Sequence, residues 1–245
     1  MKADTYTGSL TSLKKYWEEK GRTRSLEKDY SIRLEGIKQI VNEISTYLRG
    51  QLVLDIGCGP GIAASLFPVG SRIIGLDFSI SMLRNARSRI RHLVQGNALN
   101  LPFRSCSFNV VTCLFVVSDY SHKITILSEA HRVLQENGFL LFSDYSLQDE
   151  HWKFKRTIRP LMGDRCNISL KDEGPLSNEI RKAGFKVQEV KHVQFHALFK
   201  LERYVKSEQE MKQLKTKNLD LWNDVQRCIR NEKINREFIL IIGTR

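Results

Sequence analysis

The sequence of 245 residues contains only five cysteines, and no two of them form a Cys-x-x-Cys pair. No histidine cluster accompanies them at the spacing of a metal site, so we expect reduced thiols and no metal centre. The sequence also has no apolar run long enough to span a bilayer, and residues 1–6 lack the apolar core of a signal peptide. These absences predict a cytoplasmic protein with no membrane span.

Acidic residues are outnumbered, with 27 Asp and Glu against 39 Lys and Arg, which gives a net charge of +12. A basic surface can attract RNA, anionic membranes or acidic substrates. Because the sequence shows no stacking motif and no recognisable nucleic-acid-binding module, a nucleic-acid partner stays open but is not favoured. The hydrophobic fraction of 41% and the length fit one large α/β domain.

The stretch from Leu52 to Gly61 begins as a short apolar run and ends in a glycine-rich turn. The run is rich in branched aliphatics and too short for an ordinary helix, which is typical of a strand buried on both faces of a parallel sheet. Three glycines at alternate positions let the backbone turn tightly and approach a ligand. The strand, the turn and a helix predicted over 60–67 would form a ligand site at the carboxyl edge of a sheet.

The rest of the first 145 residues alternates between apolar runs and helical patterns. After the first strand at 52–56, strands are predicted over 72–77, 93–94, 108–117 and 139–142, and helices over 80–91 and 122–136. This alternation predicts a doubly wound parallel α/β sheet with right-handed crossovers. Two earlier helices, predicted over 9–20 and 25–48, precede the first strand and are placed to cover the ligand site as a lid.

The pattern changes after residue 145. Residues 146–174 are polar and irregular, and a helix over 176–183 precedes a strand over 185–193. A charged helical stretch follows over about 197–232. The last strand, over 237–243, is so apolar that it needs a buried slot in the sheet.

Two common phosphate-binding loops do not match the glycine turn. A dinucleotide loop of the form GxGxxG would need a third glycine where Ile62 stands, and a Walker loop would need a Lys-Ser or Lys-Thr pair. About twenty residues on, Asp77 ends the second strand, where an acid can accept hydrogen bonds from both hydroxyls of a ribose. Phe78 follows and offers an apolar face for a purine.

In combination these segments resemble the class I S-adenosylmethionine-dependent methyltransferases, from about residue 50 to residue 145. The turn at 55–61 matches the family's first motif, and the segments 75–83, 96–103, 107–111 and 129–138 match its later motifs. The resemblance implies a seven-stranded sheet whose last strand is antiparallel. It also implies one methyltransferase domain over 1–245, with a helical lid at 1–49, a cofactor-binding core at 50–145 and a substrate-side region at 146–245 that holds the helical insertion.

The resemblance implies a site for S-adenosyl-L-methionine, with S-adenosyl-L-homocysteine as the product. Asp77 would hold the ribose, and Asn97 would accept a hydrogen bond from the adenine amino group, where the family usually has an acid. Leu114 and Phe115 would flank the sulfonium. The full set of expected cofactor-binding residues is Asp55, Gly57, Cys58, Gly59, Gly61, Asp77, Phe78, Met82, Asn97, Ala98, Leu114 and Phe115.

Candidate residues for the acceptor side lie just beyond the strands and in the first helix. Asp119 follows the fourth strand and is the candidate base or substrate anchor, unless it caps the next helix. Tyr120 and Tyr145 are candidates to line the acceptor pocket. Tyr16 and Trp17 are candidates to close over the positively charged sulfur; packing of both rings against the body of the protein is the alternative.

The sequence therefore predicts methyl transfer to a small-molecule acceptor by in-line displacement, in which positioning and a desolvated pocket supply much of the acceleration. An RNA or protein methyltransferase and a non-catalytic cofactor-binding partner remain the alternatives. The sequence does not name the acceptor or the atom that is methylated. The apolar positions within 197–232 must bury against the domain, the lid or a second subunit, so a dimer stays open.

Overall fold

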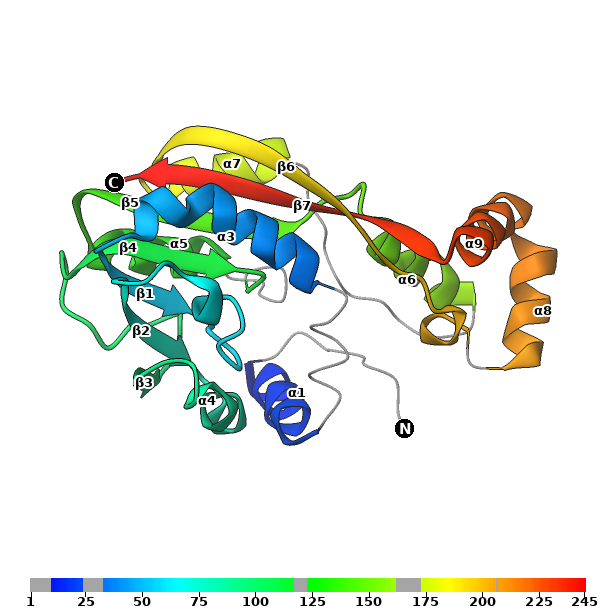
Figure 1. Cartoon of the computed structure of the whole chain (residues 1–245), viewed down its shortest axis with the longest axis horizontal. Coiled ribbons are helices and arrows are strands. Elements are labelled where there is room, and N and C mark those ends of the chain that lie inside the picture. The colour runs from blue at the N-terminus through cyan, green and yellow to red at the C-terminus, as the bar shows by residue number, and fades with distance from the viewer. Residues whose placement is uncertain (1–9, 24–32, 117–122, 162–172, 206) are drawn as a thin grey trace.

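The computed structural model describes residues 10–23, 33–116, 123–161, 173–205 and 207–245 (Figure 1). Within these residues one sheet of seven strands forms the centre, in the order β3-β2-β1-β4-β5-β7-β6. The strands are β1 Leu52–Ile56, β2 Arg72–Asp77, β3 His92–Gln95, β4 Phe108–Leu114, β5 Leu134–Tyr145, β6 Lys186–Leu198 and β7 Lys233–Thr244. The helices are α1 Leu10–Arg22, α3 Leu34–Leu48, α4 Ile80–Ala86, α5 Lys123–Val133, α6 Glu150–Leu161, α7 Glu173–Lys182, α8 Glu208–Lys217 and α9 Leu219–Asn231, with short 3₁₀ turns η1 Ala64–Leu66 and η3 Leu201–Arg203.

The sheet has the predicted mixed topology. Strands β1 to β5 pair in parallel, whereas β7 lies antiparallel between β5 and β6. All five residues from Phe238 to Ile242 are buried, because strands flank β7 on both edges and helices cover both faces of the sheet. The prediction of an α/β sheet with an antiparallel last strand is confirmed.

Alternate side chains of the strands feed two apolar layers, one on each face of the sheet. On one face Val53 and Leu141 pack with Ile40 and Ile44 of α3. On the opposite face the neighbouring residues of the same strands pack with α5 and α7. This alternation follows from the period of two along a strand and explains why the central strands are apolar throughout.

Helices α6, α8 and α9 gather around the end of the β6–β7 pair that lies away from the N-terminal half of the sheet (Figure 1). Phe154 and Ile158 of α6 are fully buried, and they belong to one apolar layer with Val225 and Cys228 of α9. The helical insertion before the last strand is therefore present, as predicted. It begins after Leu198, because β6 continues five residues beyond its predicted end at residue 193.

Several predicted elements differ from the structure. The strand predicted over 108–117 ends at Leu114, and the helix predicted over 80–91 ends at Ala86. The helix predicted over 60–67 is only the turn η1, because Gly61 has a left-handed φ of 78° and Phe67, which precedes Pro68, is extended. The segment 146–174, predicted to be irregular, contains α6. The helix predicted over 25–48 is present as α3 from Leu34 on, and residues 24–32 lie outside the described part of the chain. No helix in the described ranges has the length and hydropathy needed to cross a membrane.

Candidate functional site

A pocket lies at the carboxyl ends of β1, β2 and β4, where parallel strands deliver their following loops to the same edge of the sheet. All the residues predicted to bind a cofactor line this pocket except Gly61 and Asn97. They come from four separate parts of the chain, and the parallel strands bring them together. Residues that the sequence did not single out complete the lining, among them Arg33, Ile37 and Val116.

The glycine turn after β1 forms the floor of the pocket. Gly57, Gly59 and Gly61 have φ angles of 65°, 53° and 78°, in the left-handed region that glycine adopts at low cost. A Cβ added at Gly57 would lie 2.5 Å from a methyl carbon of Val116. Both the left-handed backbone angle and the closeness of Val116 therefore require glycine at position 57. Gly57 lines the pocket without a side chain, so a ligand can approach its backbone.

Asp77 at the end of β2 presents its carboxylate to the pocket while it is 5% exposed. One carboxylate oxygen accepts a hydrogen bond from the backbone N–H of Gly59, and the other accepts one from Ser79, both at 2.9 Å. Burial raises the pKa of Asp77 to about 6, and the negative charge of Glu18 adds to the increase. The two backbone donors hold the carboxylate in one orientation.

Asp55 lies beside the same turn and is 3% exposed. Its carboxylate accepts a hydrogen bond of 2.7 Å from the hydroxyl of Thr112 on β4. Burial raises the pKa of Asp55 to about 7, and the nearby charge of Asp77 contributes in the same direction. Two buried carboxyl groups therefore titrate close to neutral pH at one end of the pocket.

Cys58 is a small buried residue rather than a reactive thiol. Burial raises the pKa of its thiol far above the ordinary value, and the carboxylates of Asp55 and Asp77 act in the same direction. Its sulfur lies where a side chain at Gly75 would have to go, at 2.9 Å from an added Cβ. The thiol therefore stays protonated and fills space beneath the turn.

Helix α1 lies against α4 and brings Trp17 to the pocket, where its ring also packs against the apolar core. Trp17 lines the pocket, while Tyr16 is half-buried and stacks edge-on against Trp17 at 5.1 Å. Glu18 reaches across to α4, where it accepts hydrogen bonds from the Ile80 backbone N–H at 2.7 Å and from the Ser81 hydroxyl at 2.5 Å. Gly21 allows this contact, since an added Cβ would lie 2.6 Å from the Cβ of Ser81.

The other end of the pocket is formed by Arg33, just before α3, and by residues that follow β4. Nη1 of Arg33 donates a hydrogen bond of 2.5 Å to the hydroxyl of Tyr145 at the end of β5. The Tyr145 ring lies 5.2 Å from the ring of Phe115, which lines the pocket with a left-handed φ of 61°. Tyr145 thus contacts the pocket through Arg33 and Phe115.

The family model described as a methyltransferase domain matches residues 54–142 of this chain. Demethylmenaquinone methyltransferase from Lactococcus lactis subsp. lactis is 30% identical over 169 residues, which cover 56% of this chain and 67% of that protein. The chain belongs to the class I S-adenosylmethionine-dependent methyltransferase family. It is therefore a methyltransferase, and S-adenosylmethionine is the methyl donor that membership of this family implies.

Solved structures of methyltransferases share the fold. A Bacillus halodurans C-125 protein described as a methyltransferase superimposes with a TM-score of 0.65 at 21% identity, over 84% of this chain and 97% of that one. The magnesium protoporphyrin IX methyltransferase of Synechocystis PCC 6803, solved with bound S-adenosylhomocysteine, gives a TM-score of 0.61 at 17% identity, over 96% and 98% of the two chains. At these identities the likeness establishes the fold of the methyltransferase and not its acceptor.

Some predicted site residues of the methyltransferase do not line the pocket, and others lie outside the residues that the structure describes. The amide oxygen of Asn97 accepts a hydrogen bond of 3.0 Å from the Leu99 backbone N–H, and its side chain is exposed beside the lining residues Gly96 and Ala98. A Cβ added at Gly61 would lie 3.2 Å from Ile90, so Gly61 serves the packing of the loop. Asp119 and Tyr120 lie outside the described residues, and their roles remain predictions.

Arg33 is the most important residue of the pocket lining that the sequence did not predict as a site residue. It falls inside the helix predicted over 25–48 and has no motif around it. Its contact with Tyr145 joins residues 112 positions apart in the chain, so no local pattern announces it.

Proposed function

We propose that this methyltransferase transfers the methyl group of S-adenosylmethionine to a small-molecule acceptor by in-line displacement. One observation carries the proposal: a single pocket joins the glycine turn and Asp77 to an apolar end near Arg33. Helix α1 covers the same pocket through Trp17. A covered pocket suits an acceptor that enters whole more than it suits a segment of a macromolecule.

The residues at the first end of the pocket fit the methyl donor. The carboxylate of Asp77 uses two backbone N–H donors to fix its orientation, and its further lone pairs can accept hydrogen bonds from the ribose hydroxyls. The backbone of Gly57 and Gly59, which line the pocket, would face the methionine part, and Phe78 and Met82 would contact the adenine. When bound, S-adenosylmethionine supplies a methyl group that its sulfonium has already activated.

The chain's own residues then have to position the acceptor and exclude water. Leu114, Phe115 and Val116 give this part of the pocket an apolar wall at the end of β4. Such a wall lowers the local dielectric and favours a transfer in which charge is dispersed. Asp119 stays the proposed base or substrate anchor for an acceptor that arrives protonated.

The names of two similar proteins point in the same direction. One is a demethylmenaquinone methyltransferase and the other a magnesium protoporphyrin IX methyltransferase. Both names specify small-molecule acceptors. They support the class of acceptor that we propose for this chain and leave its identity open.

Calorimetry and labelling test the proposal. We expect S-adenosylhomocysteine to bind and NAD not to bind, and we expect Asp77→Ala to weaken the binding at least about tenfold, since it removes charged hydrogen bonds. Asp220→Ala, an exposed acid on α9, is the matched control. With methyl-labelled S-adenosylmethionine and a cell extract, label should enter the low-mass fraction. Label in protein or RNA would contradict the proposal, and S-adenosylhomocysteine binding without any transfer would indicate a non-catalytic partner.

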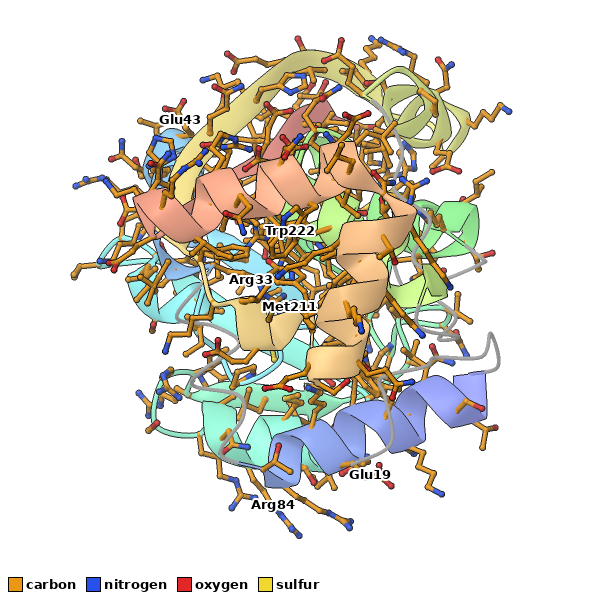
Figure 2. The ribbon with its side chains drawn as sticks, turned by 90° about the vertical axis from the view of Figure 1, so that its right-hand side faces the viewer. Glu19, Arg33, Glu43, Arg84, Met211 and Trp222 are labelled. Carbon is orange, nitrogen blue, oxygen red and sulfur yellow. The ribbon has the colours of Figure 1, made fainter. Side chains whose placement is uncertain are left out.

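A group of arginines favours RNA as the second candidate acceptor. Arg84, Arg87 and Arg91 are exposed on and just after α4, and the sequence holds no acid between Asp77 and Asp119. Figure 2 shows Arg84 at the edge of the molecule, pointing away from its body. Salt-sensitive retention of RNA that disappears in the Arg84→Gln/Arg87→Gln/Arg91→Gln variant, together with label in RNA, would favour this candidate.

A further inference from the structure

The contact between Arg33 and Tyr145 lies at one end of the pocket. The guanidinium carbon of Arg33 is 5.8 Å from the centre of the Tyr145 ring, and its Nη1 donates to the Tyr145 hydroxyl. Arg33 belongs to the pocket lining and sits at the start of α3. Figure 2 shows Arg33 near the centre of the view.

The order of the strands places this contact relative to the proposed donor site. Asp77 ends β2, Gly57 follows β1 and Leu114 ends β4, and these strands are adjacent in that order. Tyr145 ends β5, which is the next strand beyond β4. Neighbouring strands are about 4.8 Å apart. The Arg33–Tyr145 contact therefore lies beyond the end of β4, on the side opposite the ribose-binding carboxylate, where the proposed function requires the acceptor.

The charges that line the pocket are separated between its ends. Asp55 and Asp77 occupy the donor end, and Arg33 is the one cationic residue in the described lining. Ile37, Phe115 and Val116 contribute apolar surface to the same pocket. A guanidinium is a planar set of N–H donors that matches a carboxylate, and its attraction for an anion strengthens in apolar surroundings.

We propose that the acceptor is an organic anion with an apolar body, whose carboxylate or phenolate oxygen is bound by Arg33. Phe115 and Val116 contact the apolar body, and Tyr145 acts as a positioning residue that holds the guanidinium through its hydroxyl. This proposal rests on the proposed methyl transfer to a small molecule and names the chemical class of that molecule. The methionine carboxylate of the donor is the competing anion, and the experiment separates the two.

The test uses the full chain saturated with S-adenosylhomocysteine and a matched pair of probes, 2-naphthoate and 2-naphthamide, which differ in charge and share one apolar body. We expect calorimetry to show naphthoate bound at least about tenfold more tightly than naphthamide, as for a charged hydrogen bond. Arg33→Gln should abolish this preference, Arg33→Lys should keep part of it, and Tyr145→Phe should reduce it less than Arg33→Gln does. Arg49→Gln, an exposed arginine that follows the other end of α3, is the charge-matched control and should leave the preference unchanged.

Binding of S-adenosylhomocysteine to each variant is measured first. If Arg33→Gln weakens S-adenosylhomocysteine and leaves 5′-methylthioadenosine, which lacks the methionine carboxylate, unchanged, Arg33 binds the donor and the proposal is wrong. Equal affinity for the two probes in the wild-type protein, or no binding of either, also overturns it. Failure of the wild-type protein to bind S-adenosylhomocysteine would instead overturn the proposed function, and thermal unfolding of each variant confirms that it is folded.

Discussion

The hydroxyl of Ser81 donates a hydrogen bond of 2.5 Å to Oε2 of Glu18, which joins α1 to the first turn of α4 across 63 residues of sequence. The other oxygen of Glu18 accepts the backbone N–H of Ile80. A carboxylate at a helix N-terminus satisfies donors that the helix itself cannot and interacts favourably with the helix dipole. Glu18 thus positions Trp17, its neighbour in α1, over the pocket.

Replacement of Glu18 by alanine should release α1 from α4. We expect the free energy of local opening of α1 to fall by about 1 kcal/mol, as for the loss of other helix caps. We also expect weaker binding of S-adenosylhomocysteine, because Trp17 is no longer held at the pocket. Hydrogen exchange over residues 10–22 and calorimetry measure the two effects. Glu19→Ala is the matched control, since Glu19 is exposed on the same helix (Figure 2). Equal exchange rates in the two variants would show that Glu18 does not hold the helix.

The glycine turn permits a second prediction. Alanine substitutions at Gly50 and Gly57 distinguish the cost of backbone strain from the cost of a steric clash. Gly50 and Gly57 both have left-handed φ angles, 74° and 65°, but an added Cβ meets nothing within 4 Å at Gly50 and meets Val116 at 2.5 Å at Gly57. Gly50→Ala should cost about 1 kcal/mol from strain alone. Gly57→Ala should cost about 1–3 kcal/mol more from overpacking.

Urea unfolding of the two variants measures this difference. Val116→Ala removes the methyl groups that the new Cβ would meet. Adding it to Gly57→Ala should therefore restore most of the stability lost to the clash and none of the stability lost to backbone strain. Equal unfolding free energies for Gly50→Ala and Gly57→Ala would mean that Val116 moves aside without cost.

The sequence predicted the sheet better than the elements around it, for a physical reason. The strands β1 and β2 have the predicted bounds because branched aliphatics buried on both faces leave a continuous apolar run. Helix α6 was missed because Phe154 and Ile158 give it only a narrow buried stripe among charged residues. A stripe of that width is weak evidence in a sequence, and its partners in α9 lie more than sixty residues downstream.

The candidate site divides in the same way. Residues close to a strand end, such as Gly57 and Asp77, carry local sequence patterns and were predicted to lie together, as the pocket shows. Glu18 and Arg33 act through contacts 63 and 112 residues away in sequence, with Ser81 and Tyr145. Only the packing of α1 on α4 and the position of Arg33 beside the end of β5 reveal them.

A third prediction concerns the ion pair between Asp149 and Arg236, which ties the segment before α6 to β7. Nε of Arg236 donates at 2.7 Å to a carboxylate oxygen of Asp149, and both side chains are 1% exposed or less. Asp149→Ala would leave a guanidinium buried without its partner, which should cost about 3–5 kcal/mol of unfolding free energy. Asp224→Ala, which removes an exposed ion pair with Lys153 at 3.4 Å, should cost less than about 1 kcal/mol.

Thermal and urea unfolding measure both costs. The double variant Asp149→Leu/Arg236→Met removes both charges and keeps much of the volume, so it should recover part of the stability that Asp149→Ala loses. If the double variant is as unstable as Asp149→Ala, the cost comes instead from the hydrogen bonds that the Asp149 carboxylate accepts from the backbone N–H groups of Glu237 and Trp152.

The last prediction is that pH acts in opposite directions on the stability of the unliganded protein and on its affinity for the donor. Burial raises the pKa of Asp77 from 3.8 to about 6, so between these values the folded protein holds a proton that the unfolded chain has released. The stability due to this proton is present below pH 3.8 and is lost as pH rises through about 6. Donor binding needs the carboxylate, so affinity should instead rise over the same range, by up to about tenfold per pH unit.

Urea unfolding without ligand and calorimetry with S-adenosylhomocysteine, both between pH 5 and 8, measure the two slopes. Asp77→Asn cannot titrate, so it should lose the pH dependence of affinity and keep only the part of the stability slope that comes from Asp55, whose pKa is about 7. The aspartate at position 220, exposed on α9, gives the control variant Asp220→Asn, which should reproduce both wild-type slopes. An affinity that is independent of pH in the wild-type protein would show that Asp77 binds the ribose equally well when protonated, and the carboxylate would then lose its proposed role as a charged acceptor.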